Sequence, residues 1–348
     1  MVPAKDLKNN TLTELQSVVE SLDCKKYLAG YIFSFIHVKG VNVIDDITPL
    51  PRALRKKLVD AGFYISALKT LETFTDPDGT AKFLFEMGDG NRIETVLMVD
   101  SERKTLCLST QAGCKMNCAF CATGKLKFKR NLTAGEIVDQ VIAISRQQGK
   151  INNVVYMGMG EPMDNYQAVM KSVHILNDPA GLDIGARHIT ISTCGILQGI
   201  EKLAEEKLQI RLAVSLNAAN DSTRSKLMAI NNTYPLPALI KAIKTYQRRT
   251  GRRVTFEYIM INGLNDSSED AQKLCRLIKD IKANINLIEY NPHTGCEFSA
   301  SPRDKIKVFR DVLSESGREV HIRYKRGRNI KAACGQLGST LLENKQAQ

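Results

Sequence analysis

The order of strand-like and helix-like segments beyond residue 110 restricts the possible folds more than any other feature of this sequence. A helical pattern over 134–148, which opens with the capping-box pair Thr133 and Glu136, is followed by short apolar runs. These runs alternate with helical segments or long loops, which predicts an α/β fold with a parallel sheet that closes toward a barrel. The predicted strands are 153–157, 188–192, 210–216, 254–261 and 285–290.

The part of the chain before this alternation has a different character. Apolar residues with helical spacing recur through residues 1–75, which we predict to form a compact helical accessory domain. Strand-like runs follow a turn and form a predicted β extension over 76–110. The alternating core then occupies 111–338, and 339–348 are expected to be a frayed polar tail. The helical patterns are 12–22, 26–37 and 50–61.

The composition, 43% hydrophobic and 25% charged residues, is that of an ordinary globular protein. No N-terminal apolar run resembles a signal peptide and no segment approaches the length of a membrane span. We therefore expect a cytoplasmic protein with no membrane partner. Nine cysteines in that compartment indicate metal binding or catalysis rather than a disulfide framework.

The net charge of +12 lies almost entirely beyond residue 90. Basic residues gather there in three clusters, and each cluster alone could be no more than a solvated face. Because all three lie in the part of the chain that carries the motifs described next, a phosphate-rich partner is the favoured interpretation. The clusters are Lys125/Lys127/Lys129/Arg130, Arg248/Arg249/Arg252/Arg253 and Arg323/Lys325/Arg326/Arg328/Lys331.

The strongest local motif is a Cys-x3-Cys-x2-Cys spacing at Cys114, Cys118 and Cys121. Thiolates this close in sequence can converge on one iron–sulfur cluster. Three ligands on a [4Fe–4S] cluster leave one iron open, which is what a cluster needs to bind a substrate or cofactor. The alternative is a structural zinc site with Cys107 or a histidine as the fourth ligand, although zinc sites usually contain a second Cys or His pair.

A second motif, Gly158-Met-Gly-Glu-Pro162, directly follows the strand predicted at 153–157. It fails as a dinucleotide fingerprint, because Met163 stands where the third glycine is required. Backbone carbonyls and the Glu161 carboxylate at the end of a strand would instead suit a positively charged ammonium group.

With these motifs the sequence resembles the RlmN/Cfr family of radical S-adenosylmethionine (SAM) RNA-adenosine methyltransferases, and the RlmN branch more than the Cfr branch. The resemblance runs from about residue 85 to 338 and more weakly through the N-terminal helices. It implies an incomplete parallel (βα)6-type radical SAM barrel and an N-terminal helical domain that helps to hold RNA. The motifs that carry it are 93–97, 114–124, 158–162, 215–217, 290–292 and 332–336.

The resemblance also implies the cofactors, a [4Fe–4S] cluster on the three cysteines and two SAM molecules per turnover. In the family the open iron chelates the amino and carboxylate groups of SAM. Cys194 adds a thiol near this cofactor. The family's SAM contacts map onto Gly160, Glu161, Ser192, Ser215, Leu216, Asn217 and Asn291.

Three further residues acquire catalytic roles from the resemblance. The first SAM methylates Cys334, and the second yields the radical that takes hydrogen from this methyl group, so that the methylene adds to adenine. Glu94 matches the glutamate that removes a proton from the adenine carbon. Cys107 matches the thiol that attacks the Cys334 sulfur, which releases the product and leaves a transient disulfide.

The implied reaction is methylation of carbon 2 of adenosine in 23S rRNA, at the peptidyl-transferase centre, and in tRNA, at an adenosine next to the anticodon. A flavodoxin or ferredoxin is the expected electron donor, and the chain is expected to be a monomer. Two alternatives stay open at this point: methylation of carbon 8, as in Cfr, and a non-catalytic zinc-containing RNA-binding protein.

Overall fold

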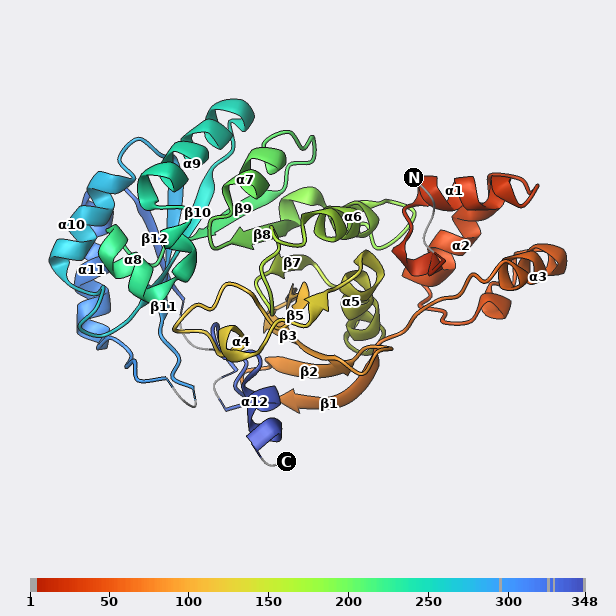
Figure 1. The fold of residues 1–348 in the computed structure, drawn as a ribbon, viewed down its shortest axis with the longest axis horizontal. Coiled ribbons are helices and arrows are strands. Elements are labelled where there is room, and N and C mark those ends of the chain that lie inside the picture. The colour runs from red at the N-terminus through yellow and green to blue at the C-terminus, as the bar shows by residue number, and fades with distance from the viewer. Residues whose placement is uncertain (1–4, 294–295, 324–325, 328, 347–348) are drawn as a thin grey trace.

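The computed structural model describes residues 5–293, 296–323, 326–327 and 329–346 (Figure 1). Within these residues the centre of the molecule is a ten-stranded sheet with the order β1-β2-β3-β4-β7-β8-β9-β10-β11-β12. The strands are β1 (Lys69–Thr75), β2 (Ala81–Glu86), β3 (Arg92–Asp100), β4 (Arg103–Cys107), β7 (Asn153–Tyr156), β8 (Ile189–Thr193), β9 (Arg211–Ser215), β10 (Val254–Met260), β11 (Ala283–Glu289) and β12 (Glu319–Arg323). A small separate sheet pairs β5 (Gln111–Ala112) with β6 (Arg130–Asn131).

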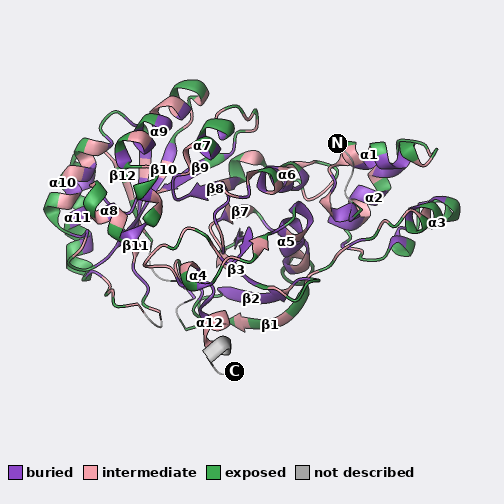
Figure 2. Ribbon diagram, in the orientation of Figure 1, coloured by how far each residue is buried: buried purple, intermediate pink, exposed green. Residues whose placement is uncertain are grey.

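The sheet has an antiparallel part and a parallel part. Strands β1 to β4 pair antiparallel, whereas each neighbouring pair from β4 to β12 is parallel. The parallel strands are mostly buried and helices cover their outer side (Figure 2), as parallel sheets require. The prediction of an α/β fold with a parallel core is confirmed. The helices of this part are α4 (Ala122–Lys125), α5 (Ala134–Gln148), α6 (Tyr166–Asn177), α7 (Leu197–Leu203), α8 (Asp221–Leu227), α9 (Leu236–Thr250), α10 (Ser268–Leu277) and α11 (Arg303–Glu315).

The capping box predicted at the start of α5 is present. The Glu136 amide donates to Thr133 Oγ1 at 3.2 Å, and the Thr133 amide donates to Glu136 Oε2 at 2.9 Å. These two bonds satisfy amides that a helix start leaves without partners. The predicted strands 153–157, 188–192, 210–216, 254–261 and 285–290 also form, with ends within two residues of those expected.

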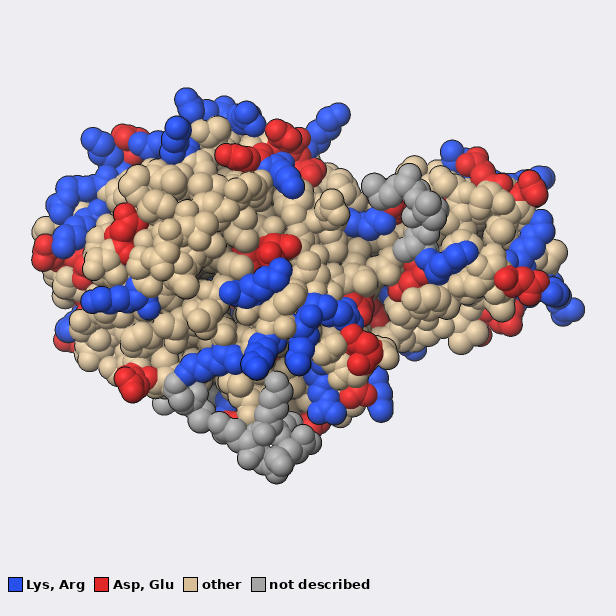
Figure 3. Space-filling view, in the orientation of Figure 1, with Lys and Arg blue, Asp and Glu red and all other residues tan. Residues whose placement is uncertain are grey.

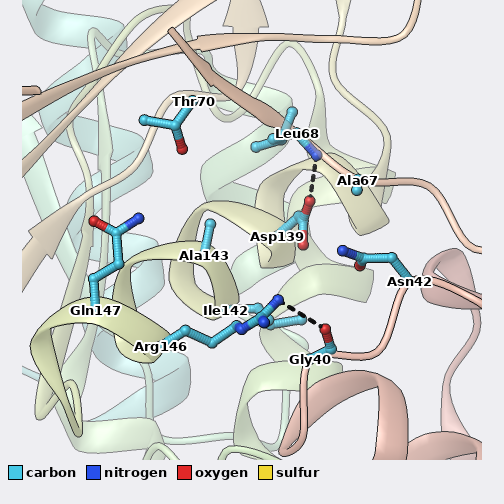
Figure 4. A pocket seen from close by; sticks show the side chains of 10 residues that line it. All are labelled: Gly40, Asn42, Ala67, Leu68, Thr70, Asp139, Ile142, Ala143, Arg146 and Gln147. Atoms are coloured by element: carbon cyan, nitrogen blue, oxygen red, sulfur yellow. Dashed lines mark hydrogen bonds between the residues drawn. The ribbon is translucent and has the colours of Figure 1, made fainter. Parts of the chain in front are cut away.

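The N-terminal helices α1 (Leu12–Ser21), α2 (Leu28–His37) and α3 (Arg52–Asp60) form a unit beside the barrel, as Figure 1 shows. Lys8 links this unit to the core, because its Nζ lies 2.6 Å from Asp139 Oδ1 on α5 and both side chains are buried. A cavity of about 340 Å³ lies next to this contact. Figure 4 shows Asp139 accepting the Leu68 amide there.

Two boundary expectations are wrong in detail. Residues 69–75 form β1 and not part of a helix, because this threonine-rich segment pairs antiparallel with β2. The expected frayed tail instead contains α12 (Ser339–Gln346), and Thr340 accepts a hydrogen bond from Lys82 Nζ at 2.8 Å. In the part of the chain that the structure describes, no helix has both the length and the apolar character needed to cross a membrane.

Candidate functional site

The three motif cysteines lie on one loop that leads into α4. The Cys121 amide donates to the Cys118 carbonyl at 3.1 Å, which closes a tight turn, and Cys121 is the residue before the first turn of α4. A second contact fixes the loop from outside, since the Ala119 amide donates to the Leu227 carbonyl at the end of α8 at 2.9 Å. Local sequence and a long-range backbone contact therefore hold the three thiols together.

The three thiols are close enough for their charges to interact. Burial raises the pKa of Cys118 well above its usual value, and the neighbouring Cys121 and Cys114 thiolates raise it further. Burial likewise raises the pKa of Cys114 to about 12. A metal that binds such thiols takes the place of their protons.

The donor set fits an iron–sulfur cluster, for which thiolates are the usual protein ligands. Among the described residues no group of three or more Cys, His, Asp and Glu side chains is arranged to hold a single metal ion. The ligands of a four-iron cluster bind separate corners, so they stand farther apart than the ligands of one ion. The spacing of Cys114, Cys118 and Cys121 is compatible with that geometry.

The Gly158–Pro162 turn follows β7 and packs directly against the segment after β4. A Cβ at Gly158 would lie 2.6 Å from the Leu108 carbonyl oxygen, and one at Gly160 would lie 2.6 Å from the Gln111 side chain. Gly160 also has a φ of +102°, a backbone conformation that residues with a side chain rarely adopt. Both glycines are therefore required by the close approach of two backbones.

This turn presents Glu161 to the interior. The carboxylate is buried and accepts two amide bonds, from Met163 at 3.0 Å and from Cys194 at 2.8 Å. Burial raises the pKa of Glu161, and these hydrogen bonds oppose that effect. Glu161 in turn raises the pKa of Cys118, so the carboxylate lies near the cysteine loop. A cation bound at this position would be stabilised by the negative charge of Glu161 and by that of the nearby cysteine thiolates.

The polar residues at the ends of β8 and β9 meet at the same edge of the sheet. Ser192 lies on β8, and Ser215 ends β9 and is followed by Leu216 and Asn217. Asn217 has a positive φ of 59° and its Oδ1 accepts the Ile259 amide at 3.0 Å. Buried Asn265 donates to the Asn217 carbonyl at 2.8 Å. The strained conformation is thus fixed by contacts to β10 and the loop that follows it.

Asn291, just after β11, connects this edge to the C-terminal segment. Its Nδ2 donates to the Cys334 carbonyl at 3.3 Å and to the Glu289 carbonyl at 3.1 Å. The segment is also bound to α4, because the Ala122 amide donates to the Gly335 carbonyl at 2.8 Å. The predicted methyl-acceptor cysteine is therefore held between the end of β11 and the cysteine loop.

Cys334 and Cys107 lie close enough to influence each other electrostatically. Cys107 ends β4 and is buried, and its pKa is raised first by burial and then by the Cys334 thiolate. Cys334 is exposed to solvent but surrounded by protein on several sides, so that burial raises its pKa to about 11. Both are free thiols. The two thiols therefore interact electrostatically, and the transient disulfide that the family resemblance implies between them stays a prediction.

Glu94, on β3, lies on the other side of this C-terminal segment and is fully buried. Its Oε2 accepts the Gly338 amide at 2.7 Å, and its Oε1 lies 3.4 Å from Lys82 Nζ on β2. The carboxylate therefore has a cation and a backbone amide as partners rather than an open cavity.

Comparison with known proteins matches residues 108–278 to the radical SAM superfamily. A protein of Moorella thermoacetica described as a probable dual-specificity RNA methyltransferase RlmN is 45% identical over 342 residues, which cover 95% of this chain and 96% of the relative. This chain belongs to the RlmN family of radical SAM proteins. A Bacillus cereus protein with the same description is 46% identical over 330 residues, 94% of this chain and 91% of the relative.

A solved structure supports the family at the level of the fold. The crystal structure of a radical SAM methyltransferase from Sphaerobacter thermophilus superposes with a TM-score of 0.91 at 42% identity. The alignment covers 96% of this chain and 99% of that one. The radical SAM barrel expected from the sequence is therefore confirmed, and the family implies a [4Fe–4S] cluster and SAM as cofactors.

The basic clusters do not lie together. Arg248, Arg249, Arg252 and Arg253, the far-end arginines, precede β10 and so lie at the amino-terminal edge of the parallel strands. The cysteine loop lies past the carboxyl end of β4, at the opposite edge. All four far-end arginines have partners. Arg249 pairs with Glu205 at 3.6 Å and Arg253 with Glu319 at 2.6 Å. Arg252 donates to the Glu206 carbonyl and Arg248 to Thr245 Oγ1, both at 3.0 Å.

The first basic cluster does border the site. Lys125, Lys127 and Lys129, the loop lysines, are exposed and directly follow the cysteine loop. Figure 3 shows Lys and Arg gathered in a band over the region of α4, and a separate gathering over α9. In the third cluster Lys325 and Arg328 lie outside the described residues.

Sequence reasoning missed three buried charged residues near the site. Lys82 contacts Glu94, Arg224 contacts the ends of β8 and β9, and Glu257 on β10 acts on Cys334. Burial raises the pKa of Glu257 to about 7, although Asn286 donates a hydrogen bond to it at 2.8 Å. Two of these residues leave a sign in the sequence, because Lys82 and Glu257 are charged residues within otherwise largely apolar strands.

Proposed function

We propose that this chain methylates carbon 2 of adenosine in 23S rRNA and in tRNA, using Cys334 as a methyl carrier. The observation that carries the proposal is the position of Cys334, bound to both the cysteine loop and the end of β11 and electrostatically coupled to Cys107. The description of the relatives as probable dual-specificity RNA methyltransferases supports an RNA substrate and favours this reaction over methylation of carbon 8.

In this proposal Cys114, Cys118 and Cys121 hold the [4Fe–4S] cluster. SAM occupies the edge formed by the Gly160–Glu161 turn, Ser192, the Ser215–Asn217 segment and Asn291, with two SAM molecules used per turnover. Glu161 and backbone carbonyls at that edge bind the amino group of SAM, since they supply negative charge in a buried place. When bound, the cluster and SAM supply the one-electron chemistry that polar attack on an electrophilic adenine carbon lacks.

Cys334 accepts the first methyl group. Its sulfur forms a bond to the methyl carbon while the methyl–sulfonium bond of SAM breaks, and the thiol proton is lost to solvent, to which Cys334 is exposed. Because its pKa is about 11, this thiol is protonated at neutral pH. Methylation should therefore accelerate as the pH rises through the range from 7 to 10.

Cys107 and Glu94 act after the methylene group has joined the adenine. Glu94 removes the proton from the adenine carbon, and the unpaired electron of the adduct passes to the bound cluster. The Cys107 sulfur then attacks the Cys334 sulfur and breaks its bond to the methylene carbon, which takes a proton to become the methyl group. The disulfide left on the protein must be opened by a reductant. Since the Gly338 amide and Lys82 occupy the Glu94 carboxylate, the Gly338 segment must move away when adenine enters.

The loop lysines provide the phosphate contacts nearest to this site. They are exposed and lie beside the cysteine loop, whereas the far-end arginines lie at the opposite edge of the barrel. An RNA backbone that crosses the loop lysines could place one unstacked base over Cys334. Recognition of an unstacked base in this way is usual for RNA-specific proteins.

The N-terminal helical domain is proposed to hold a second part of the RNA. Tyr27 and Tyr31 are 63% and 40% exposed on one face of α2, with ring centroids 6.4 Å apart. Lys25 and Lys26 are exposed beside them. Exposed aromatic rings next to lysines suit base stacking. Tyr27→Ala with Tyr31→Ala should weaken RNA binding about tenfold, whereas Val59→Ala on α3, as a control, should not.

The test of the proposed function uses RNA from a strain that lacks this gene. Mass spectrometry of 23S rRNA and tRNA should show loss of 2-methyladenosine, restored by the wild-type gene but not by a Cys334→Ala gene. Loss of 8-methyladenosine would assign the reaction to carbon 8. Unchanged methylation, together with stoichiometric zinc in anaerobically purified protein, would leave the non-catalytic RNA-binding alternative.

The remaining expectations belong to the same proposal. A flavodoxin or ferredoxin delivers the electrons, and the enzyme works in the cytoplasm as a monomer. Anaerobic turnover with purified flavodoxin and its reductase tests the first point, and light scattering of the iron-loaded chain tests the monomer.

A further inference from the structure

Arg224, on α8, is the largest fully buried side chain of the described residues and lies beside the proposed cofactor site. Its guanidinium donates to the carbonyls of Cys194 at 2.6 Å, Leu216 at 3.1 Å and Ser215 at 3.3 Å. It also donates to Asn231 Oδ1 at 2.9 Å. All four of these acceptors are neutral.

A buried cation with neutral partners is costly, because it has lost its hydration without gaining a counter-charge. Arginine cannot escape this cost by losing its proton. Asp221 acts on Arg224 through its charge and through Asn231, whose Nδ2 donates to Asp221 Oδ1 at 3.0 Å, but Asp221 is exposed, so that solvent weakens its effect. The protein chain alone therefore leaves most of the positive charge of Arg224 uncompensated.

The missing negative charge has an evident source in the cysteine loop. The Ala119 amide of that loop donates to Leu227, one turn along α8 from Arg224. Cys118 of the loop packs against the buried cluster that contains Leu227 and Cys194, and Arg224 binds the Cys194 carbonyl, so the guanidinium and the loop lie against the same group of side chains. Thiolate ligands of a cluster would place negative charge where this cation lies.

We propose that Arg224 is the counter-charge of the cluster held by Cys114, Cys118 and Cys121, and that it raises the reduction potential of this cluster. Reduction adds one negative charge to the cluster, and a fixed nearby cation stabilises that charge. Net charge and hydrogen bonding around a cluster are known to set its potential. Arg224 is a positioning residue in addition, because the carbonyls it binds belong to Ser215 and Leu216 of the SAM edge.

The inference rests on the proposed cluster, so its test begins with the wild-type chain. The full-length protein is reconstituted with iron and sulfide under anaerobic conditions, and its potential is measured by a redox titration followed by electron paramagnetic resonance. A wild-type chain that binds no cluster would overturn the proposed function itself. A wild-type cluster with a measurable potential allows Arg224 to be tested separately.

Two variants separate charge from hydrogen bonding. Arg224→Gln retains donors but removes the charge, and Arg224→Lys retains the charge but removes most donors. We expect Arg224→Gln to shift the reduction equilibrium about tenfold toward the oxidised cluster, which is about 59 mV for one electron. Arg224→Lys should stay within a third of that shift. The matched control is Arg211→Gln, which removes an exposed charge at the other end of β9.

The outcomes are decisive in both directions. A potential for Arg224→Gln equal to that of the wild type, at full iron content, overturns the inference. If Arg224→Gln folds, as judged by circular dichroism, but takes up no iron while Arg224→Lys does, the charge is required for the cluster and the inference holds. If both variants fold and neither takes up iron, hydrogen bonding and not charge is the reason, and the inference is wrong.

Discussion

Lys82→Met is the perturbation that most directly tests the arrangement around Glu94. Lys82 Nζ lies 3.4 Å from Glu94 Oε1, and the two side chains are 1% and 0% exposed. Lys82 also donates to Thr340 Oγ1 at 2.8 Å, which ties α12 to β2. Methionine has a similar length and no charge, so the substitution removes the ion pair with little change in volume.

The expected cost follows from this burial. Removing one partner of a buried ion pair typically destabilises a protein by about 3–5 kcal/mol, because the other charge stays buried without compensation. Loss of the hydrogen bond to Thr340 adds about 1 kcal/mol. The exposed pair of Lys331 with Glu343 provides the control, and Lys331→Met should cost less than about 1 kcal/mol.

Urea denaturation of the three proteins, followed by circular dichroism, measures these free energies of unfolding. A functional readout accompanies it. Without Lys82 the Glu94 carboxylate loses the contact that holds its Oε1 in place. Removal of the adenine proton should then slow, so Lys82→Met should retain RNA on the protein as a covalent adduct. A variant with wild-type stability and normal product release would refute the reasoning about both the pair and Glu94.

The remaining predictions concern the cluster, the thiols and the RNA surface. Cys118→Ala should lose the iron and all SAM cleavage; iron analysis that finds full occupancy contradicts the assigned ligands. Cys107→Ala should accumulate a protein–RNA adduct that survives denaturation and collapses with ribonuclease, whereas Cys334→Ala should form none, and two merely inactive variants would disprove these roles. Glu94→Ala should still methylate Cys334, seen by peptide mass spectrometry, yet release little product. Neutralising the three loop lysines should reduce the slope of log binding constant against log salt concentration by about 3, one for each lost phosphate contact. An equal reduction from the far-end arginines would contradict the orientation proposed for the RNA.

The elements of this fold that the sequence predicts are those with local causes. The α5 capping box and the alternation of strands and helices depend on neighbours in sequence, and both were expected in the right places. The cysteine loop is similarly local, with three proposed cluster ligands inside eight residues. The resemblance of the whole sequence to a known family then extended the prediction to Cys334, more than 200 residues away. Only the structure shows that the Cys334 segment lies beside the cysteine loop.

The features that escaped prediction arise from contacts between distant segments. Arg224 looks like an ordinary basic residue on a short helix, and only the folded chain shows that it binds Cys194 and Ser215. Charge counts also carry no information on which edge of a sheet a residue occupies, so the sequence did not show that the far-end arginines lie at the edge opposite the cysteine loop. Residues 69–75 read as helical since the pairing that makes them a strand involves β2.

The attachment of the C-terminal segment to α4 affects how the protein responds to oxidation of its cluster. The Ala122 amide and the Thr123 hydroxyl donate to the Gly335 and Leu337 carbonyls, at 2.8 and 2.6 Å, immediately after the last cysteine of the loop. With Cys121 as the proposed ligand, an oxidant that destroys the cluster would release this residue, which directly precedes Ala122 and Thr123. The arm that carries Cys334 would then loosen together with the loop, so oxygen damage would disable the methyl carrier as well as the electron entry point, and a protease that cuts near residue 330 would report the loss of iron.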